Sequence, residues 1–401
     1  MIPARLETGR KPRILVVAGA RPNFVKIAPL MSSMRTAVDS PVDVLLVHTG
    51  QHYDDAMSHV FFEQLGIPRP DMNLDVGSGS HGSQTAEIML RFEPVVTGWR
   101  PDVVVVVGDV NSTIACTLVA TKLGIRVAHV EAGLRSFDRG MPEEINRVLT
   151  DAVSNYLFVT EPSGVDNLRR EGVDESRIFH VGNVMIDSLT AFLPAARKTL
   201  ILRELGLVPE QDAVAPRPYV LLTLHRPSNV DDPAKFGPLL EVLSEIAVDV
   251  PVVFPVHPRT KANLARFGFA DRVRFGPPAC EPGIWLLPPA GYLEFMHLMS
   301  QAALVLTDSG GIQEETTVLG VPCLTLRDNT ERPVTVDEGT NTLVGSDPSR
   351  ILNEARRVLA GRGKRGRVPE LWDGAAAQRI VAVLLDRLRQ EVPEIGRVER
   401  S

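Results

Sequence analysis

The 401-residue sequence is long enough for two or three domains, and its 44% hydrophobic and 23% charged residues are ordinary for a water-soluble globular protein. A formal net charge of −6 argues against a general nucleic-acid binder. Three widely spaced cysteines, Cys116, Cys280 and Cys323, form no disulfide or zinc-binding pattern, so we predict small buried thiols, a reducing cytoplasm and no structural zinc.

The N-terminal sequence resembles a secretory signal peptide only in part. A basic stretch at residues 10–13 precedes a short apolar run that ends in small residues. The run is too short for the apolar core of a signal, and Arg21 and Lys26 follow at once, so a first buried strand fits better. No segment approaches the roughly 20 apolar residues of a membrane span. We therefore expect a cytoplasmic protein with no membrane partner and no nucleic-acid partner.

Short apolar runs rich in β-branched residues alternate with helix-length segments along the chain. Such alternation predicts βαβ units and parallel sheets that are covered by helices on both faces. The first series of predicted strands is 14–17, 44–48, 103–107, 126–130, 156–160 and 178–181. The second series is 219–225, 252–256, 273–275, 303–307 and 322–326.

The two series of strands predict an α/β protein of two Rossmann-like, doubly wound domains that face each other across a cleft. We expect the first domain at 1–190 and the second at 191–373, with the charged and proline-rich segment 199–218 near the entry to the second. The final segment, 374–401, carries an amphipathic helix that needs a surface to bury against. The basic, glycine-rich stretch 361–367 is too short for a nucleic-acid tract and predicts a solvated connector.

Polar residues that follow the first two strands are candidates for a site, because ligands of open parallel sheets bind beyond the carboxyl ends of the strands. A glycine turn at Gly19 leads to Arg21 and Lys26, two cations that suit a polyphosphate. The same pair could be solvated cations on a surface turn. The polar residues 49–52 either line the same edge or begin an ordinary helix, and both alternatives stay open.

Acidic residues gather beyond the later strands of the first domain. Asp109 follows an all-valine strand, where a desolvated carboxylate suits proton transfer, although a helix N-cap is the commoner use of such an aspartate. Glu131 ends the next strand, and Glu143 follows it near Arg135 and Arg147. A structural ion-pair network would explain one such pair, but three acidic positions in one half-domain favour acid–base catalysis.

A strand, a sharp turn and a helix follow one another at 303–319 of the second domain. This order aims backbone N–H groups and the positive end of a helix at a phosphate. Glu314 and Glu315 are expected in the first turn of the helix, where carboxylates offset the helix dipole, although one of the pair could instead bind the hydroxyls of a ribose. The pattern is neither a P-loop nor Gly-x-Gly-x-x-Gly. The turn consists of Ser309, Gly310 and Gly311.

Seven short motifs run in order along most of the chain and together resemble the non-hydrolysing UDP-N-acetylglucosamine 2-epimerases. They are Gly-Ala-Arg-Pro-Asn-Phe-Val-Lys from 19, Thr-Gly-Gln-His from 49, Gly-Asp-Val-Asn-Ser-Thr from 108, His-Val-Glu-Ala-Gly-Leu-Arg from 129, Pro-Glu-Glu-Ile-Asn-Arg from 142, Asp-Ser-Gly-Gly-Ile-Gln-Glu-Glu from 308 and Arg-Asp-Asn-Thr-Glu-Arg-Pro from 327. The resemblance implies a glycosyltransferase-B architecture in which the C-terminal helix crosses back onto the first domain. We also expect a homodimer.

The resemblance also implies roles for single residues. The expected catalytic residues are Asp109, Glu131, Glu143 and His225. The expected substrate-binding residues are Arg21, Lys26, Phe295, Ser309, Gly310, Gly311, Glu315 and Arg332. Without the resemblance, His225 would be a capping or core histidine and Arg332 a surface ion pair. Two departures from the family pattern are Pro-Ser before Asn229, where many members have an acidic residue, and Ala290 in place of a polar residue.

The reaction implied by the resemblance is the reversible C2 epimerisation of UDP-N-acetylglucosamine to UDP-N-acetylmannosamine, without cofactor or metal, for cell-surface polysaccharide synthesis. Elimination of UDP to 2-acetamidoglucal and its re-addition require acid–base groups on both faces of the sugar ring. Cations and helix-end N–H groups must stabilise the departing UDP. The alternatives are a 2-epimerase of a modified UDP-sugar, a hydrolysing 2-epimerase and a glycosyltransferase of the same fold.

Overall fold

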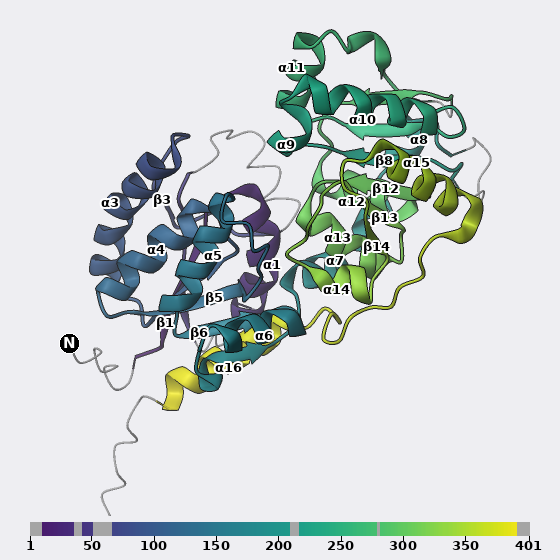
Figure 1. Ribbon diagram of the computed structural model, residues 1–401. Coiled ribbons are helices and arrows are strands. Elements are labelled where there is room, and N and C mark those ends of the chain that lie inside the picture. The colour runs from purple at the N-terminus through teal and green to yellow at the C-terminus, as the bar shows by residue number, and fades with distance from the viewer. Residues whose placement is uncertain (1–9, 36–41, 51–65, 209–215, 279–280, 391–401) are drawn as a thin grey trace, which may run out of the picture. The chain divides into compact units, whose positions relative to one another are not determined.

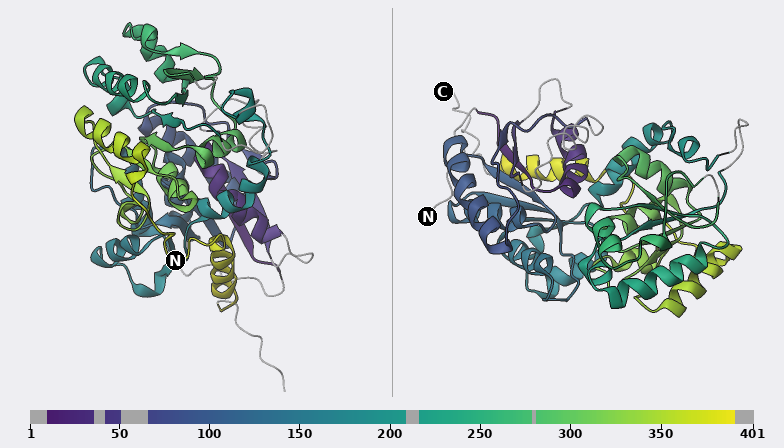
Figure 2. Two further views of the ribbon diagram at one scale, coloured as in Figure 1. Left: turned by 90° about the vertical axis from the view of Figure 1, so that its right-hand side faces the viewer. Right: turned by 90° about the horizontal axis from the view of Figure 1, so that it is seen from above.

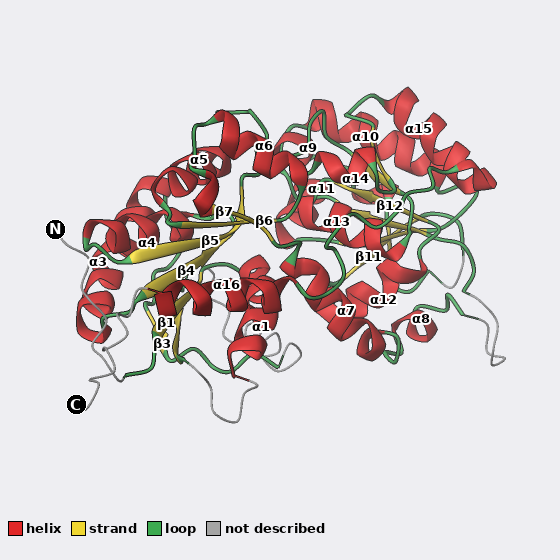
Figure 3. Ribbon diagram, turned by 90° about the horizontal axis from the view of Figure 1, so that it is seen from below, coloured by secondary structure: helices red, strands yellow, loops and turns green. Residues whose placement is uncertain are grey.

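The chain divides into two compact units, each an open parallel sheet with helices on both faces, which confirms the predicted α/β class (Figures 1 and 3). Unit 1 comprises Met1–Ser188 and Asp373–Ser401, and unit 2 comprises Leu189–Trp372. The computed structural model describes residues 10–35, 42–50, 66–208, 216–278 and 281–390.

The sheet of unit 1 has, in the described part of the chain, seven parallel strands in the order β3-β2-β1-β4-β5-β6-β7. The strands are β1 (Arg13–Ala18), β2 (Asp43–His48), β3 (Met72–Asn73), β4 (Val103–Val107), β5 (Arg126–Ala132), β6 (Tyr156–Val159) and β7 (Ile178–His180). The strand order reverses between β1 and β4, which is where ligands of such sheets bind. All six predicted strands are present. The sequence does not predict β3, because two exposed residues at a sheet edge carry no apolar pattern.

Two layers of helices cover the sheet of unit 1. The helices are α1 (Arg21–Arg35), α3 (His81–Trp99), α4 (Asn111–Lys122), α5 (Pro142–Val153), α6 (Pro162–Arg170), α16 (Ala376–Gln390), the first residues of α7 (Val184–Ala196), and the 3₁₀ helix η1 (Glu175–Arg177). Helices α3, α4 and α5 lie side by side on one face, and α1 and α16 pack together on the other (Figures 2 and 3).

Helix α16 is the amphipathic helix that the C-terminal sequence predicts. Its apolar side, which includes Ile380, Leu384 and Leu388, is fully buried. The carboxylate of Asp187 accepts hydrogen bonds from the N–H groups of Ala376 (3.1 Å) and Ala377 (2.7 Å) at the start of α16. A carboxylate there satisfies unpaired donors and favours the positive end of the helix. Thus the last described helix of the chain is built into unit 1.

The sheet of unit 2 also has seven parallel strands in the described residues, in the order β10-β11-β9-β8-β12-β13-β14. The strands are β8 (Val220–Thr223), β9 (Val252–Pro255), β10 (Arg274–Phe275), β11 (Ile284–Leu287), β12 (Leu304–Thr307), β13 (Cys323–Thr325) and β14 (Asn341–Leu343). The five predicted strands are present, somewhat shortened. Strands β11 and β14 are absent from the prediction, although β11 is a buried apolar run (Ile-Trp-Leu-Leu), whereas β14 (Asn-Thr-Leu) is mostly polar.

Alternate residues of these strands belong to two separate hydrophobic cores. Leu304 and Leu306 pack with α10 and α15 in one cluster, whereas Val305 packs with α8, α12 and α13 in another. The helices of unit 2 are most of α7, α8 (Ile201–Glu204), α9 (Pro227–Val230), α10 (Pro233–Ile246), α11 (Pro258–Arg266), η2 (Ala270–Arg272), α12 (Tyr292–Gln301), α13 (Gly310–Leu319), α14 (Pro333–Asp337), α15 (Pro348–Arg357) and η3 (Val358–Arg362).

The basic segment 361–367 is not the fully solvated connector that the sequence predicts. The Lys364 ammonium donates to the carbonyl oxygens of Val336 and Asn341, the second at 3.4 Å, and burial lowers the pKa of Lys364. A cation there satisfies the carbonyl group of Val336 at the end of α14. Across the described residues, no helix combines the length and the apolar character that a membrane crossing requires.

Candidate active site

Glu131 occupies a strained position near the carboxyl end of β5. Its φ is +75°, a conformation that residues other than glycine rarely adopt. The register between β5 and β6 shifts between Val130 and Ala132, so Glu131 lies in a β-bulge, which re-aims a side chain. Such strain persists only where the surrounding structure enforces it, and it clusters at functional sites. The backbone alone therefore marks Glu131 as a functional candidate.

Lys26 of α1 donates a hydrogen bond to the Glu131 carboxylate, and both side chains are buried. The alternative of a solvated surface cation is therefore wrong for Lys26. Helix α1 follows β1 directly because Gly19 permits the close approach of Ser112, whose Oγ would lie 2.5 Å from a Cβ at position 19. Arg21 is the first residue of α1, and its side chain lies outside the described part of the structure. The ion pair joins a predicted phosphate-binding cation to a predicted catalytic carboxylate.

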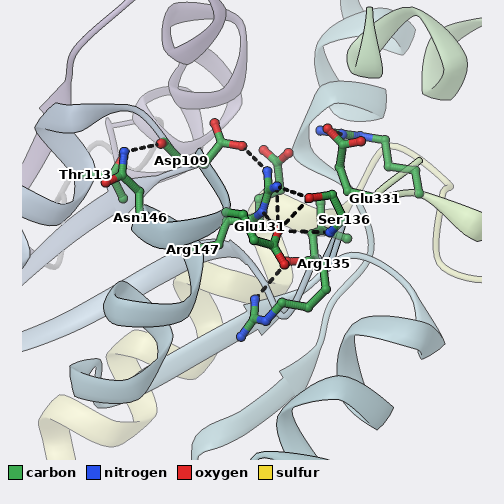
Figure 4. Close-up of polar contacts among 12 residues, drawn as sticks. Asp109, Thr113, Glu131, Arg135, Ser136, Asn146, Arg147 and Glu331 are labelled. Atoms are coloured by element: carbon green, nitrogen blue, oxygen red, sulfur yellow. Dashed lines mark hydrogen bonds and ion pairs between the residues drawn. The ribbon is translucent and has the colours of Figure 1, made fainter. Parts of the chain in front are cut away.

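Asp109 lies just beyond β4 and forms an ion pair with Arg147 of α5 (Figure 4). The side-chain amide of Asn146 donates to the Asp109 carbonyl at 2.8 Å, which fixes the backbone of this turn. The N-cap of α4 is Val110, so the N-cap alternative for Asp109 is wrong. The Asp109 side chain is 29% exposed whereas that of Arg147 is 3% exposed. A buried guanidinium thus holds a carboxylate that solvent and substrate can still reach.

Glu144 is the buried acid at the start of α5. It accepts hydrogen bonds from the N–H groups of Ser136 (2.9 Å) and Phe137 (3.0 Å) and pairs with Arg147 at 2.7 Å. Burial raises the pKa of Glu144, but these donors outweigh it and bring the pKa below its ordinary value. Glu144 is therefore an ionised anchor for Arg147. The spacing of three residues between them on one helix is a signal from which the sequence could have identified this pair.

Glu143, the predicted catalytic neighbour, has a different environment. It is half-buried in the first turn of α5, and among the described residues it forms no side-chain hydrogen bond or ion pair. Its carboxylate is therefore not committed to the network that holds Arg147, which leaves it available to a ligand.

In unit 2, a buried aspartate that the sequence did not single out organises the segment after β8. The Asp308 carboxylate contacts the His225 ring at 2.8 Å and accepts from the N–H of Arg226 at 2.9 Å and from the Asn229 amide at 3.1 Å. Burial raises the pKa of Asp308, but the His225 ring and these donors lower it below its ordinary value. The His225 side chain is 50% exposed, so His225 is not a core histidine. Asp308 holds one ring nitrogen while the rest of the ring remains accessible.

The predicted phosphate-binding turn forms the start of α13. Ser309 is the N-cap, and Gly310 and Gly311 are the first helical residues, whose N–H groups have no acceptor within the helix. A Cβ at position 310 would lie 2.5 Å from Nη1 of Arg332, so glycine lets a guanidinium approach the helix end. Backbone donors and a cation therefore meet at one point, as an anion site requires.

Two expectations about neighbouring charged residues were wrong. Glu314 and Glu315 lie beyond the first turn of α13, because the helix begins at Gly310, so neither is a helix-start carboxylate. Glu314 instead pairs with Arg332, with 2.7 Å between Oε1 and Nε. Arg332 is buried, and it is therefore not a surface ion pair. Glu331, which contacts Arg332 at 3.4 Å, completes the cluster, and the surrounding arginines outweigh its burial and lower its pKa.

Glu315 is buried and accepts a hydrogen bond from the Tyr292 hydroxyl at 3.4 Å. Burial first, and then the charge of Glu314, raise the pKa of Glu315 to about 8. Phe295, one turn beyond Tyr292 on α12, is half-buried against the core of unit 2. Part of the predicted 49–52 element, Gln51 with His52, lies outside the described residues, as does Cys280. Among the described residues, no three His, Cys, Asp or Glu side chains gather as a metal site.

Comparison with known proteins places the chain in a family. The sequence model of UDP-N-acetylglucosamine 2-epimerase matches residues 35–385. The chain belongs to this family. The UDP-N-acetylglucosamine 2-epimerase of Methanocaldococcus jannaschii is 43% identical over 376 residues, which cover 93% of this chain and 98% of that protein. A Pseudomonas aeruginosa UDP-2,3-diacetamido-2,3-dideoxy-D-glucuronate 2-epimerase is 41% identical, with 94% of this chain and 100% of that protein covered.

The fold agrees with a solved structure of the same family. The crystal structure of the M. jannaschii UDP-GlcNAc 2-epimerase in complex with UDP-GlcNAc and UDP matches with a TM-score of 0.83 at 42% identity, covering 93% of this chain and 99% of that one. This member of the 2-epimerase family therefore has the two-domain, Rossmann-like fold of the glycosyltransferase-B type. Its candidate residues fall into two sets. Unit 1 contains Lys26, Asp109, Glu131 and Glu143, and unit 2 contains His225, Ser309, Gly310, Gly311, Glu315 and Arg332.

Proposed function

We propose that the protein interconverts UDP-N-acetylglucosamine and UDP-N-acetylmannosamine by inverting C2 of the sugar. The observation that carries the proposal is the pairing of a strained, buried glutamate with a lysine in unit 1, in a chain whose family acts at C2 of a nucleotide sugar. C2 has no carbonyl beside it, so its hydrogen is only weakly acidic. Removal of this proton together with departure of UDP from C1 avoids a free carbanion and gives 2-acetamidoglucal.

In this proposal unit 1 supplies the proton transfers. Asp109, Glu131 and Glu143 are the candidate acid–base groups, because the intermediate must be reprotonated at C2 from the opposite face. Lys26 pairs with Glu131 and Arg147 pairs with Asp109, so each of these carboxylates has a cationic partner. Phosphate contact by Arg21 and Lys26 belongs to the same proposal, since either cation could shift to the diphosphate as UDP leaves.

Unit 2 holds the nucleotide in this proposal. The N–H groups of Gly310 and Gly311 and the Arg332 guanidinium stabilise the diphosphate that leaves C1. His225, held by Asp308, donates to a phosphate or sugar oxygen. Glu315 accepts from the ribose hydroxyls, and the start of α12 with Phe295 holds the uracil. The buried cluster around Glu331 prevents Arg332 from turning away.

A second substrate is favoured by one observation. The P. aeruginosa enzyme that acts on a 2,3-diacetamido uronate is 41% identical, and the M. jannaschii enzyme is 43% identical. This small difference in sequence identity does not favour one UDP-sugar over the other. The UDP-2,3-diacetamido-2,3-dideoxy-D-glucuronate is therefore the alternative substrate, which differs at C3 and carries a further carboxylate.

One experiment tests the reaction and the choice of sugar. The purified protein is incubated with each UDP-sugar separately, without acceptor, NAD or added metal, and the products are followed by proton NMR. Appearance of the C2 epimer with UDP attached supports the proposal. Release of free N-acetylmannosamine would indicate a hydrolysing enzyme, and no conversion until an acceptor is added would indicate a glycosyltransferase.

The homodimer that we expect has a candidate surface on α5. This helix buries polar residues, including Arg147 and Asp151, and exposes an apolar stripe of Ile145 (48%), Leu149 (48%) and Val153 (36%). A contiguous exposed apolar stripe on a helix is typical of an interaction surface. A twofold axis at Leu149 would pair Ile145 of one copy with Val153 of the other, so the stripe is self-complementary. We propose that two copies of the chain associate through it.

Light scattering after size exclusion tests this association. The parent protein should have twice the mass of one chain, and Leu149→Glu should be monomeric. Leu90→Glu, at another exposed apolar residue of unit 1, is the matched control and should remain dimeric. A parent protein that is monomeric at high concentration contradicts the assignment.

We also propose that the protein works in the cytoplasm and supplies an activated sugar for a cell-surface polysaccharide. Nucleotide sugars are the activated form that glycosyltransferases consume. Cys116 and Cys323 are free, buried thiols, and burial raises their pKa, that of Cys323 to about 12. Fractionation of cells that express a tagged chain tests the location.

A further inference from the structure

A chain of buried charged groups in unit 1 has no role in the proton transfers proposed above. His129 of β5 is fully buried, with Nδ1 2.6 Å from Oδ1 of Asp151 and Nε2 2.8 Å from the carbonyl oxygen of Gly108. The other oxygen of Asp151 accepts from the N–H of Gly133 at 3.0 Å and pairs with Arg135 at 2.7 Å. These contacts link the ends of β4 and β5 to α5.

The protonation state of His129 follows from its partners. A carbonyl oxygen can only accept, so Nε2 of His129 must carry a proton. Asp151 is ionised, because its other oxygen accepts from the N–H of Gly133 and pairs with the guanidinium of Arg135, which is always charged. An ionised carboxylate also only accepts, so Nδ1 must carry a proton too. Both ring nitrogens are therefore donors, which makes His129 an imidazolium.

The buried charges balance along this chain. Among the described residues, the charged group that contacts the His129 ring is Asp151, and Arg135 contacts the other carboxylate oxygen of Asp151. Arg135 also donates to the carboxylate of Glu171 through Nε at 2.8 Å and Nη2 at 2.6 Å. Two cations thus alternate with two anions, of which Glu171 lies at the surface with its side chain 37% exposed. Such a fully paired arrangement can be buried, whereas removal of one member leaves an uncompensated charge.

The position of this chain relates it to the catalytic candidates. Asp151 holds residues on both sides of Glu131: its Oδ1 holds His129, two residues before, and its Oδ2 holds the N–H of Gly133, two residues after. The strained φ of Glu131 lies between these two fixed points. Nε2 of His129 also holds the carbonyl of Gly108, the residue before Asp109.

We propose that His129 is a permanently charged imidazolium that, together with Asp151, positions the carboxylates of Glu131 and Asp109. The pair does not touch substrate and takes no part in proton transfer. The expected effect of this pair on turnover rests on the proposed epimerase function, whereas the charge state of His129 does not depend on that function.

The charge state is measured on the parent protein without substrate. The histidines are labelled with ¹⁵N, and the ring signals of His129 are assigned by their loss in His129→Asn. At pH 8, where a free histidine with pKa of about 6.5 is neutral, both ring nitrogens of His129 should carry slowly exchanging protons. His297, a buried histidine of unit 2 whose pKa is lowered by burial, is the internal contrast and should be neutral. A single protonated nitrogen on His129 would overturn the proposal.

The positioning role is measured with two variants that each keep one donor. His129→Asn retains an amide near the Nδ1 position, and His129→Gln retains one near Nε2, but neither carries a charge. We expect kcat to fall about 10- to 100-fold in both, as misplacement of a reacting group by a fraction of an ångström does, with KM and UDP affinity unchanged. His297→Asn is the matched control and should keep kcat.

Unchanged kcat in both folded variants would overturn the positioning role. If neither variant folds, Asp151→Asn replaces them, because it keeps the shape of the side chain but loses the charge that pairs with His129, and unchanged kcat there has the same meaning. A parent protein that converts no UDP-sugar counts against the proposed function alone, since the ring-nitrogen measurement needs no substrate.

Discussion

The Tyr292 hydroxyl lies 3.4 Å from Oε1 of Glu315 in the interior of unit 2, and this carboxyl has a pKa raised to about 8, by burial first and then by Glu314. Glu315 is therefore largely protonated near neutral pH in the ligand-free protein. A group in this state costs little to bury, and it can still meet the hydroxyls of a ribose. Its two properties, an elevated pKa and a ribose-binding role, lead to separate predictions.

The elevated pKa predicts a pH-dependent stability. The folded protein binds the Glu315 proton more tightly than the unfolded chain does, so this proton stabilises the fold at low pH, and the stabilisation is lost as the pH rises from 4.5 to about 8. Glu315→Gln has no such proton. Relative to the parent, its free energy of unfolding should rise across this interval by at most about 1.4 kcal/mol per pH unit.

Urea denaturation at several pH values measures the difference. Glu370→Gln, at an exposed glutamate of the same unit, is the control and should follow the parent at every pH. Parallel curves for Glu315→Gln and the parent would show that Glu315 is not a tightly protonated group.

The ribose-binding role predicts a loss of nucleotide affinity. Glu315→Ala removes two hydrogen bonds to the ribose that contribute about 0.5–1.5 kcal/mol each for a largely protonated carboxyl, so UDP should bind roughly tenfold more weakly. Titration calorimetry with UDP measures this, and Tyr292→Phe tests the partner. Unchanged UDP affinity in folded Glu315→Ala would reassign Glu315 to the structure of unit 2.

Much of the fold was predictable because buried parallel strands are continuous apolar runs. Val103–Val107, with all five residues buried, appears in the sequence as a strand without further information. Met72–Asn73 and Asn341–Leu343 were not predicted, since the first is exposed and the second mostly polar, so neither forms an apolar run. Propensity and periodicity describe a segment by itself, whereas these strands exist only through tertiary pairing.

The site was predictable in its residue types but not in their environments. Glu131 and Glu315 were singled out, yet the strained φ of the one and the raised pKa of the other depend on residues distant in the sequence. Asp151 and Asp308 were missed. In the sequence Asp151 is an ordinary polar residue of a helix and Asp308 an ordinary turn residue, and only the fold shows that each carboxylate gathers several donors.

Arg332 gives the next prediction. Its guanidinium pairs with Glu314 through Nε and lies over Gly310, which requires the planar fork of arginine. Arg332→Lys keeps the charge but cannot make both contacts, so UDP should bind about tenfold more weakly, the equivalent of one lost charge-assisted contact. Arg356→Lys, at an exposed arginine of α15, is the control and should bind UDP as the parent does. Equal affinity in both variants would remove Arg332 from the phosphate site.

The carboxylates of unit 1 are tested by substitutions that keep their shape. Asp109→Asn and Glu131→Gln should each lower turnover by roughly 10²–10⁴, the contribution of a general acid or base, with little change in UDP affinity. UDP affinity should change little because most of the proposed nucleotide contacts lie in unit 2. A loss of thermal stability that matches the loss of activity would instead assign the two residues to the ion-pair networks with Arg147 and Lys26.

The last prediction follows the proton at C2. If carboxylates of unit 1 remove it and return it, the returning proton comes from groups that exchange with solvent, so reaction in D₂O should place deuterium at C2 of the UDP-N-acetylmannosamine formed. Mass spectrometry and the loss of the C2 proton signal measure this. A small amount of UDP and 2-acetamidoglucal should accumulate as released intermediate. Glu131→Gln is the matched variant and should slow deuterium entry and epimerisation together. Conversion with C2 still protonated would rule out elimination and favour an oxidation–reduction route at the sugar.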